Sequence, residues 1–108
     1  MYEQNQIEIA DSFVALFIPP GRLRPTASRA EISARYEFCE DLASHLFEHA
    51  RAQHYDHGVA EGEVLDRVLM GLSQPASGVD NAEAGWVVRR LAELEGWPWA
   101  ADRTSPNT

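Results

Sequence analysis

The sequence predicts an all-α fold, a small bundle of about four helices with a Pro/Arg-rich loop after the first short helix. Apolar residues recur at intervals of three and four along three segments, which is the spacing of helices with one buried face. Two of the expected helices begin with a capping-box sequence, and no segment alternates convincingly like a strand. A length of 108 residues suits one domain. We therefore expect a single helical domain over 1–108, ordered from about 9 to 99 and flexible at 1–8 and 102–108.

The first helix is expected to be short. Asp11 or Ser12 can cap its start through a side-chain oxygen. The helix should run to Ile18 and end there, because Pro19 and Pro20 have no amide hydrogen to donate.

The second helix is expected to be the longest. Ser28-Arg29-Ala30-Glu31 has the form of a capping box, and Gly58 can cap the other end after about His57. Its apolar stripe consists of Ile32, Tyr36, Cys39, Ala43, Leu46 and Ala50. The opposite face, which we expect to be solvated, carries Glu37, Glu40, Asp41, Ser44 and Glu48.

Two more helices are expected in the second half of the chain. One covers residues 61–72, with Val64, Leu65, Val68, Leu69 and Leu72 on its apolar face. Residues 73–78 then form a turn, and a second capping box, Asp80-Asn81-Ala82-Glu83, begins the last helix. Gly96 ends this helix, whose apolar face consists of Ala84, Val87, Val88, Leu91 and Leu94.

The charge and the amino-acid composition of the chain exclude several functions. Its 17 acidic and 9 basic residues give a formal net charge of −8, which disfavours nucleic-acid binding. The sequence contains no lysine and no G-x-x-x-x-G-K-[ST] motif, so Schiff-base chemistry and P-loop nucleotide binding are excluded. We therefore expect no ATPase activity, no catalytic residue and no cofactor.

The expected compartment is the cytoplasm. Cys39 is the single cysteine and cannot form an internal disulfide, which favours a reducing environment. The apolar run at 13–18 is too short for a membrane span or a signal-peptide core. We expect no membrane association.

The loop over residues 19–26 is the principal candidate for binding a partner. It is rigid, apolar and locally basic, and its candidate binding residues are Pro19, Pro20, Arg22, Leu23 and Arg24. A guanidinium can hold a carboxylate through two hydrogen bonds. The alternative is that these arginines only neutralise nearby glutamates.

Trp97 and Trp99, which flank Pro98 after the last helix, are further candidates for partner binding. The alternative is that both indoles fold back and cover the small core.

A metal site is considered at His45 and His49, which lie one helical turn apart, with Asp41 one turn earlier. The sequence has no H-E-x-x-H motif, and no metal is predicted. His54 returns to the apolar stripe, where we expect a partly buried, hydrogen-bonded structural role.

Three segments carry a family resemblance: residues 17–26, Arg35-Tyr36-Glu37-Phe38-Cys39-Glu40-Asp41-Leu42-Ala43, and residues 85–97, which begin Gly85-Trp86-Val87-Val88-Arg89-Arg90. Together they resemble a family of small uncharacterised bacterial proteins, some of which are labelled "ATPase with chaperone activity". The resemblance covers most of the chain and implies no established mechanism. It is compatible with a role beside a larger ATPase or chaperone.

The sequence therefore favours a non-enzymatic protein-interaction or regulatory module, accessory to a larger assembly. The expected partner is a protein, acidic where it meets the arginines, and formation of a homodimer is left open. An alternative is a nucleic-acid-binding regulator of the helix-turn-helix type, and a third is a His-dependent metal-binding protein.

Overall fold

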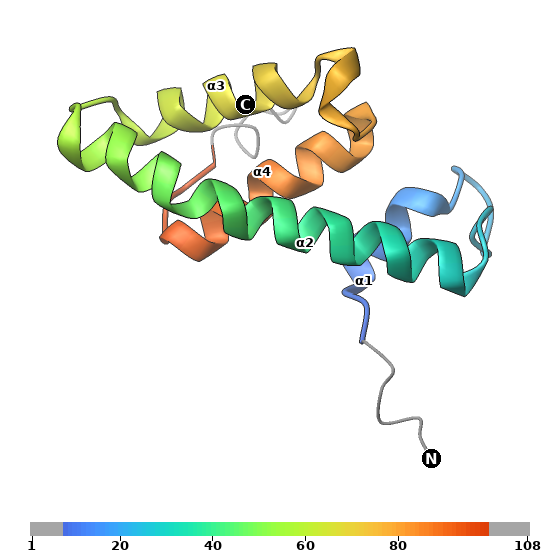
Figure 1. Ribbon diagram of the computed structural model, residues 1–108. Helices are drawn as coiled ribbons and strands as arrows, with labels where there is room; N and C mark the ends of the chain where they lie inside the picture. Colours follow the sequence, from blue (N-terminus) through green and yellow to red (C-terminus); the bar gives the residue numbers. More distant parts are fainter. Residues whose placement is uncertain (1–7, 100–108) are drawn as a thin grey trace. The chain divides into compact units, whose positions relative to one another are not determined.

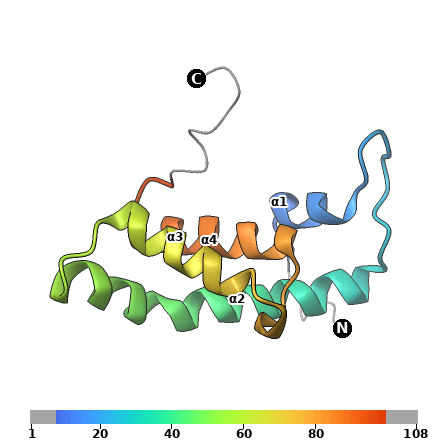
Figure 2. The ribbon, with the colours of Figure 1, turned by 90° about the horizontal axis from the view of Figure 1, so that it is seen from above.

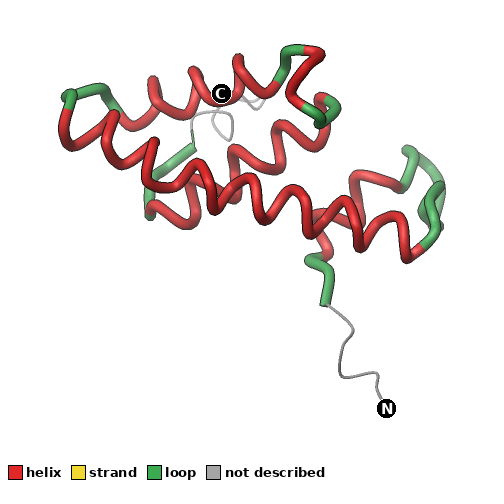
Figure 3. Tube along the Cα trace, viewed as in Figure 1, coloured by secondary structure: helices red, strands yellow, loops and turns green. Residues whose placement is uncertain are grey.

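The computed structural model describes residues 8–99, which are drawn as the coloured ribbon in Figure 1. The described residues form two compact units, unit 1 up to Phe38 and unit 2 from Cys39 onward. Throughout the described part, helices are joined by loops and no strand is present (Figure 3). This confirms the predicted all-α class. The flexible ends predicted at 1–8 and 102–108 lie outside the described residues, except for Glu8. The prediction of one domain stays a prediction.

Unit 1 begins with a short helix that the sequence predicted. Helix α1, Asp11–Val14, continues as the 3-10 turn η2, Ala15–Phe17. The predicted cap is wrong, because Ala10 occupies the N-cap position and no side chain caps the helix. Asp11 instead lies in the first turn, where its carboxylate complements the positive end of the helix dipole.

Helix α2, Arg29–Arg51, has the capping box predicted from the sequence. The Ser28 amide donates to Glu31 Oε1 at 2.8 Å, and the Glu31 amide donates to Ser28 Oγ at 3.1 Å. Beyond Arg51 the helix widens into the π-helical turn η3, Ala52–Asp56, which was not predicted. Gly58 follows with φ +73°, the left-handed conformation expected of a residue that ends a helix.

The core of unit 1 is centred on Phe13. Its side chain is fully buried, and its ring packs against Phe17 at 5.5 Å and edge-on against Tyr36 at 5.4 Å between ring centres. Ile9 and Ile32 are also buried in this unit. Aromatic pairs in these orientations add to the stabilisation from buried area.

Unit 2 contains residues 39–51 of α2 together with α3, Glu61–Leu72, and α4, Asn81–Glu95. The predicted bounds of α3 are confirmed.

Helix α4 begins with the second predicted capping box. In it, the Glu83 amide donates to Asp80 Oδ1 at 2.8 Å, and the Asp80 amide donates to Glu83 Oε1 at 3.1 Å. Gly96, with φ +79°, ends α4 as predicted. The 3-10 turn η4, Pro75–Ser77, lies between α3 and α4.

The core of unit 2 draws on all three helices. Its fully buried apolar side chains are Cys39, Ala43, Ala50, Val64, Leu65, Ala84, Val87, Val88 and Leu91. Four positions predicted on the apolar faces of this unit are less buried than expected: Leu46, Val68 and Leu69 are only half-buried, and Leu94 is 37% exposed at the end of α4. Small residues on α2 therefore provide much of its buried stripe.

Candidate protein-interaction site

The loop between η2 and α2 is shaped by a tight turn at its start. The Arg22 amide donates to the Pro19 carbonyl at 3.0 Å, so Pro20 and Gly21 are the central residues of the turn. Gly21 has φ +78°, which is the conformation required at the third position of a type II turn. Proline before glycine is the preferred sequence for this turn.

The base of the loop is closed by Thr26. Its amide and its hydroxyl both donate to the Phe17 carbonyl, at 2.8 and 3.1 Å. These two bonds join the end of η2 to the segment that leads into α2. Figure 2 shows the loop projecting beyond the two helical segments that it connects. The tip of the loop therefore projects from a hydrogen-bonded base.

The tip of the loop exposes an apolar side chain between two cations. Leu23 is 94% exposed, and Arg22 and Arg24 beside it are exposed as well. Neither guanidinium has a hydrogen bond or an ion pair with any residue in the described part of the chain. The alternative that these arginines neutralise nearby glutamates therefore has no support from the geometry of unit 1.

An apolar groove of about 240 Å³ lies at the foot of this loop, within unit 1. The buried side chains of Ile9 and Ile32 contribute to its wall. Its other lining residues are Val14, Pro25, Ala27 and Arg29. Pro25 and Ala27 belong to the segment that returns from the tip of the loop, so the groove and the loop are continuous.

The chain segment that contains the loop is locally basic. Between Asp11 and Glu31 the sequence contains three arginines (Arg22, Arg24 and Arg29) and no acidic residue, in a chain of net charge −8. Arg29 is exposed and, like the two loop arginines, has no ion pair within 8–99. This local excess is the opposite of the overall charge.

The histidines considered for metal binding are not assembled into a site. His45 Nδ1 lies 2.9 Å from the backbone carbonyl of Asp41, so the contact does not use the Asp41 carboxylate. His49 lines a different groove, described below. Among residues 8–99 no group of three His, Cys, Asp or Glu side chains is arranged to hold a metal ion.

The two tryptophans after α4 are buried. Trp97 and Trp99 are each 6% exposed. The His54 ring packs edge-on against Trp97, with 5.1 Å between ring centres, and its Nδ1 donates to the Val59 carbonyl at 2.7 Å. This burial favours the folded-back alternative over partner binding for both indoles. His54 is partly buried and hydrogen-bonded, as expected from the sequence.

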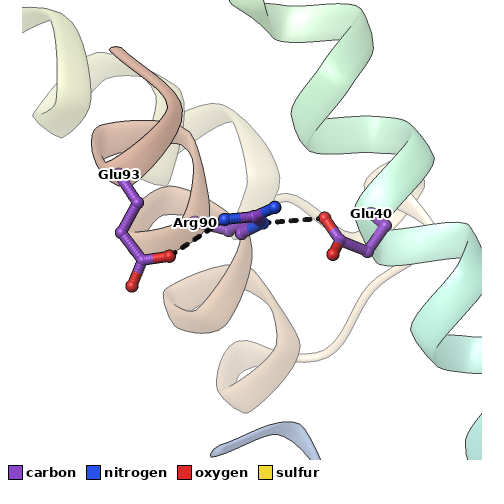
Figure 4. Close-up of polar contacts among 3 residues, drawn as sticks. All are labelled: Glu40, Arg90 and Glu93. Carbon is purple, nitrogen blue, oxygen red and sulfur yellow. Dashed lines mark hydrogen bonds and ion pairs between the residues drawn. The ribbon is translucent and has the colours of Figure 1, made fainter. Parts of the chain in front are cut away.

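An ion pair in unit 2 corrects the prediction that Glu40 is only solvated. Arg90 Nε donates to Glu40 Oε1 at 2.9 Å, and Arg90 Nη1 donates to Glu93 Oε1 at 3.1 Å (Figure 4). The bond to Glu40 is the main reason that the pKa of Arg90 is raised above its ordinary value. The pair links α2 to α4 and holds this arginine in a structural role.

Unit 2 also contains a buried carboxylate. The side chain of Glu95 has no exposed surface, and its nearest cation, Arg51 Nη1, lies 3.6 Å from Oε1. Neither carboxylate oxygen has a hydrogen bond with another described residue. Burial raises the pKa of Glu95, and the charge of Arg51 opposes that shift only in part.

A second groove, of about 200 Å³, lies between α2 and α3. Leu46, Val64, Val68 and Leu72 are among its lining residues. Arg67 at this groove pairs with Glu63 at 2.7 Å, so no unpaired arginine faces it. The groove therefore lacks the charge pattern found beside the loop of unit 1.

Comparison of the chain with protein-family models, with curated proteins and with solved structures finds no match. Within residues 8–99, no helix has the length and apolar character needed to cross a bilayer.

The candidate interaction site is defined by its own geometry: a loop anchored by hydrogen bonds, an exposed leucine between unpaired arginines, and an apolar groove.

Proposed function

We propose that this protein is a non-catalytic interaction module whose loop over residues 19–26 binds an acidic segment of a partner protein. One observation carries the proposal: Leu23 is 94% exposed between two arginines that have no partner in the described chain. An exposed leucine contributes little to folding, whereas burial in an interface stabilises a complex by about 1.5–3 kcal/mol.

The shape of the loop reduces the entropy lost on binding. Pro19, Pro20 and the two bonds from Thr26 to Phe17 restrict its conformations before a partner arrives. Arg22 and Arg24 can then form charge-assisted hydrogen bonds to carboxylates with little further ordering of the backbone. A role beside a larger assembly is compatible with this mode of binding.

The helix-turn-helix alternative is less well supported. Its second helix would be α4, whose first turn carries the carboxylates of Asp80 and Glu83 in a capping box. These charges oppose docking against phosphates. The connection over residues 73–80 is also longer than the three- or four-residue turn of that motif.

Site-specific photocrosslinking in native cells tests the proposal. A benzoylphenylalanine placed at Leu23 should form a covalent adduct with one or a few proteins, and R22A/R24A in the same chain should remove that adduct. The matched control places the same probe at Met70, which is 68% exposed in unit 2. Equal adduct patterns at both positions, or adducts that persist in R22A/R24A, would contradict the proposal.

A further inference from the structure

We infer that the groove beside the loop receives one apolar side chain of an acidic peptide segment while Arg22, Arg24 and Arg29 hold flanking carboxylates. This inference rests on the proposed function of the loop, and it specifies the chemistry of the partner. The occupant is a segment in which an apolar residue is flanked by aspartate or glutamate.

The size of the groove sets the kind of side chain that fits. An apolar cavity of about 150 Å³ is large enough to bind benzene. At about 240 Å³ the groove has room for one leucine or aromatic side chain, but not for the whole face of a helix. Ile9, Val14 and Ile32 line the groove and provide an apolar environment for that side chain.

The arginines of the loop and of the start of α2 favour acidic residues on either side of the bound apolar side chain. Arg29 is the first residue of α2, where the helix dipole disfavours a cation. It also lacks an ion pair within the described chain. A carboxylate bound beside it would interact favourably with both the guanidinium and the dipole. Arg22 and Arg24 supply two more donors on the loop that leads to the groove.

Two synthetic peptides separate the groove from the arginines. The first is a fluorescein-labelled heptapeptide with leucine at its centre and aspartate or glutamate elsewhere; the second has serine at its centre. Fluorescence anisotropy with the full chain should show at least about tenfold tighter binding of the leucine peptide, because burial of one leucine side chain strengthens binding by at least about that factor. The leucine peptide should also shift the methyl resonances of Ile9, Val14 and Ile32.

Two variants complete the test. Ala27→Leu fills the groove and should reduce the preference for the leucine peptide to less than about threefold, while R22A/R24A should weaken both peptides. If Ala27→Leu does not fold, the methyl shifts in the unaltered chain decide the question. Equal affinities for the two peptides, with no methyl shifts but a dependence on Arg22 and Arg24, would overturn the groove inference and leave the proposed function standing. If R22A/R24A does not weaken either peptide, both are overturned.

Discussion

The ion pair between Glu40 and Arg90 should contribute measurably to the stability of unit 2. Its N–O distance is 2.9 Å, and the arginine and glutamate side chains are 34% and 28% exposed. Fully exposed pairs contribute about 0.2–1 kcal/mol, and hydrogen bonds to charged groups about 1.5–3 kcal/mol. After Glu40→Ala, Arg90 keeps Glu93 at 3.1 Å, so no unpaired buried charge remains. We therefore expect a loss of about 1 kcal/mol.

Urea denaturation of Glu40→Ala, Arg90→Ala and the double variant measures this contribution as a coupling energy. A coupling of about 1 kcal/mol is expected. Asp41→Ala is the matched control, because Asp41 is exposed on the same helix and its side chain has no partner in the described chain. That control should stay within about 0.5 kcal/mol of the parent. A coupling near zero, with Glu40→Ala no different from Asp41→Ala, would refute the structural role of the pair.

Two further predictions concern the core and the buried carboxylate. Leu65→Ala, at a fully buried position, should lower the free energy of unfolding by about 2–5 kcal/mol. Leu46→Ala should lower it by less, because Leu46 is only half-buried. Equal losses for the two variants in urea denaturation would contradict this prediction. Burial raises the pKa of Glu95, so its carboxyl group stays protonated to a higher pH in the folded chain than in the unfolded chain. The contribution of this group to stability is fully present below its unfolded pKa and is lost as the pH rises through its folded pKa. Glu95→Gln should therefore be more stable relative to the parent at pH 7 than at pH 4, and the reverse order would show that the Arg51 pair dominates.

The elements that the sequence predicted well depend on local interactions. Both capping boxes join residues three apart, so the residue pattern specifies their hydrogen bonds. The bounds of α3 follow from its apolar spacing. The loop was predicted from its prolines, which exclude a helix whatever the tertiary structure.

The features that were missed depend on residues far apart in the chain. Glu40 and Arg90 are separated by 50 positions, so a helical projection of α2 assigned the glutamate to solvent. Leu46 lies at the centre of the apolar stripe, but it opens onto a groove instead of packing fully. Ile9 and Ile32 form part of the groove in unit 1 only after folding brings them together. No local pattern indicates these arrangements.

The most direct test of the interaction module is the affinity of the crosslinked partner, once purified, for three forms of the chain. The parent, R22A/R24A and the control R67A/R89A, which removes two exposed arginines from unit 2, are compared by isothermal titration calorimetry. Loss of charge-assisted hydrogen bonds at an interface predicts at least about tenfold weaker binding for R22A/R24A. The control should bind like the parent. Unchanged affinity for R22A/R24A, or an equal loss in both variants, would contradict the assignment of the loop as the binding element.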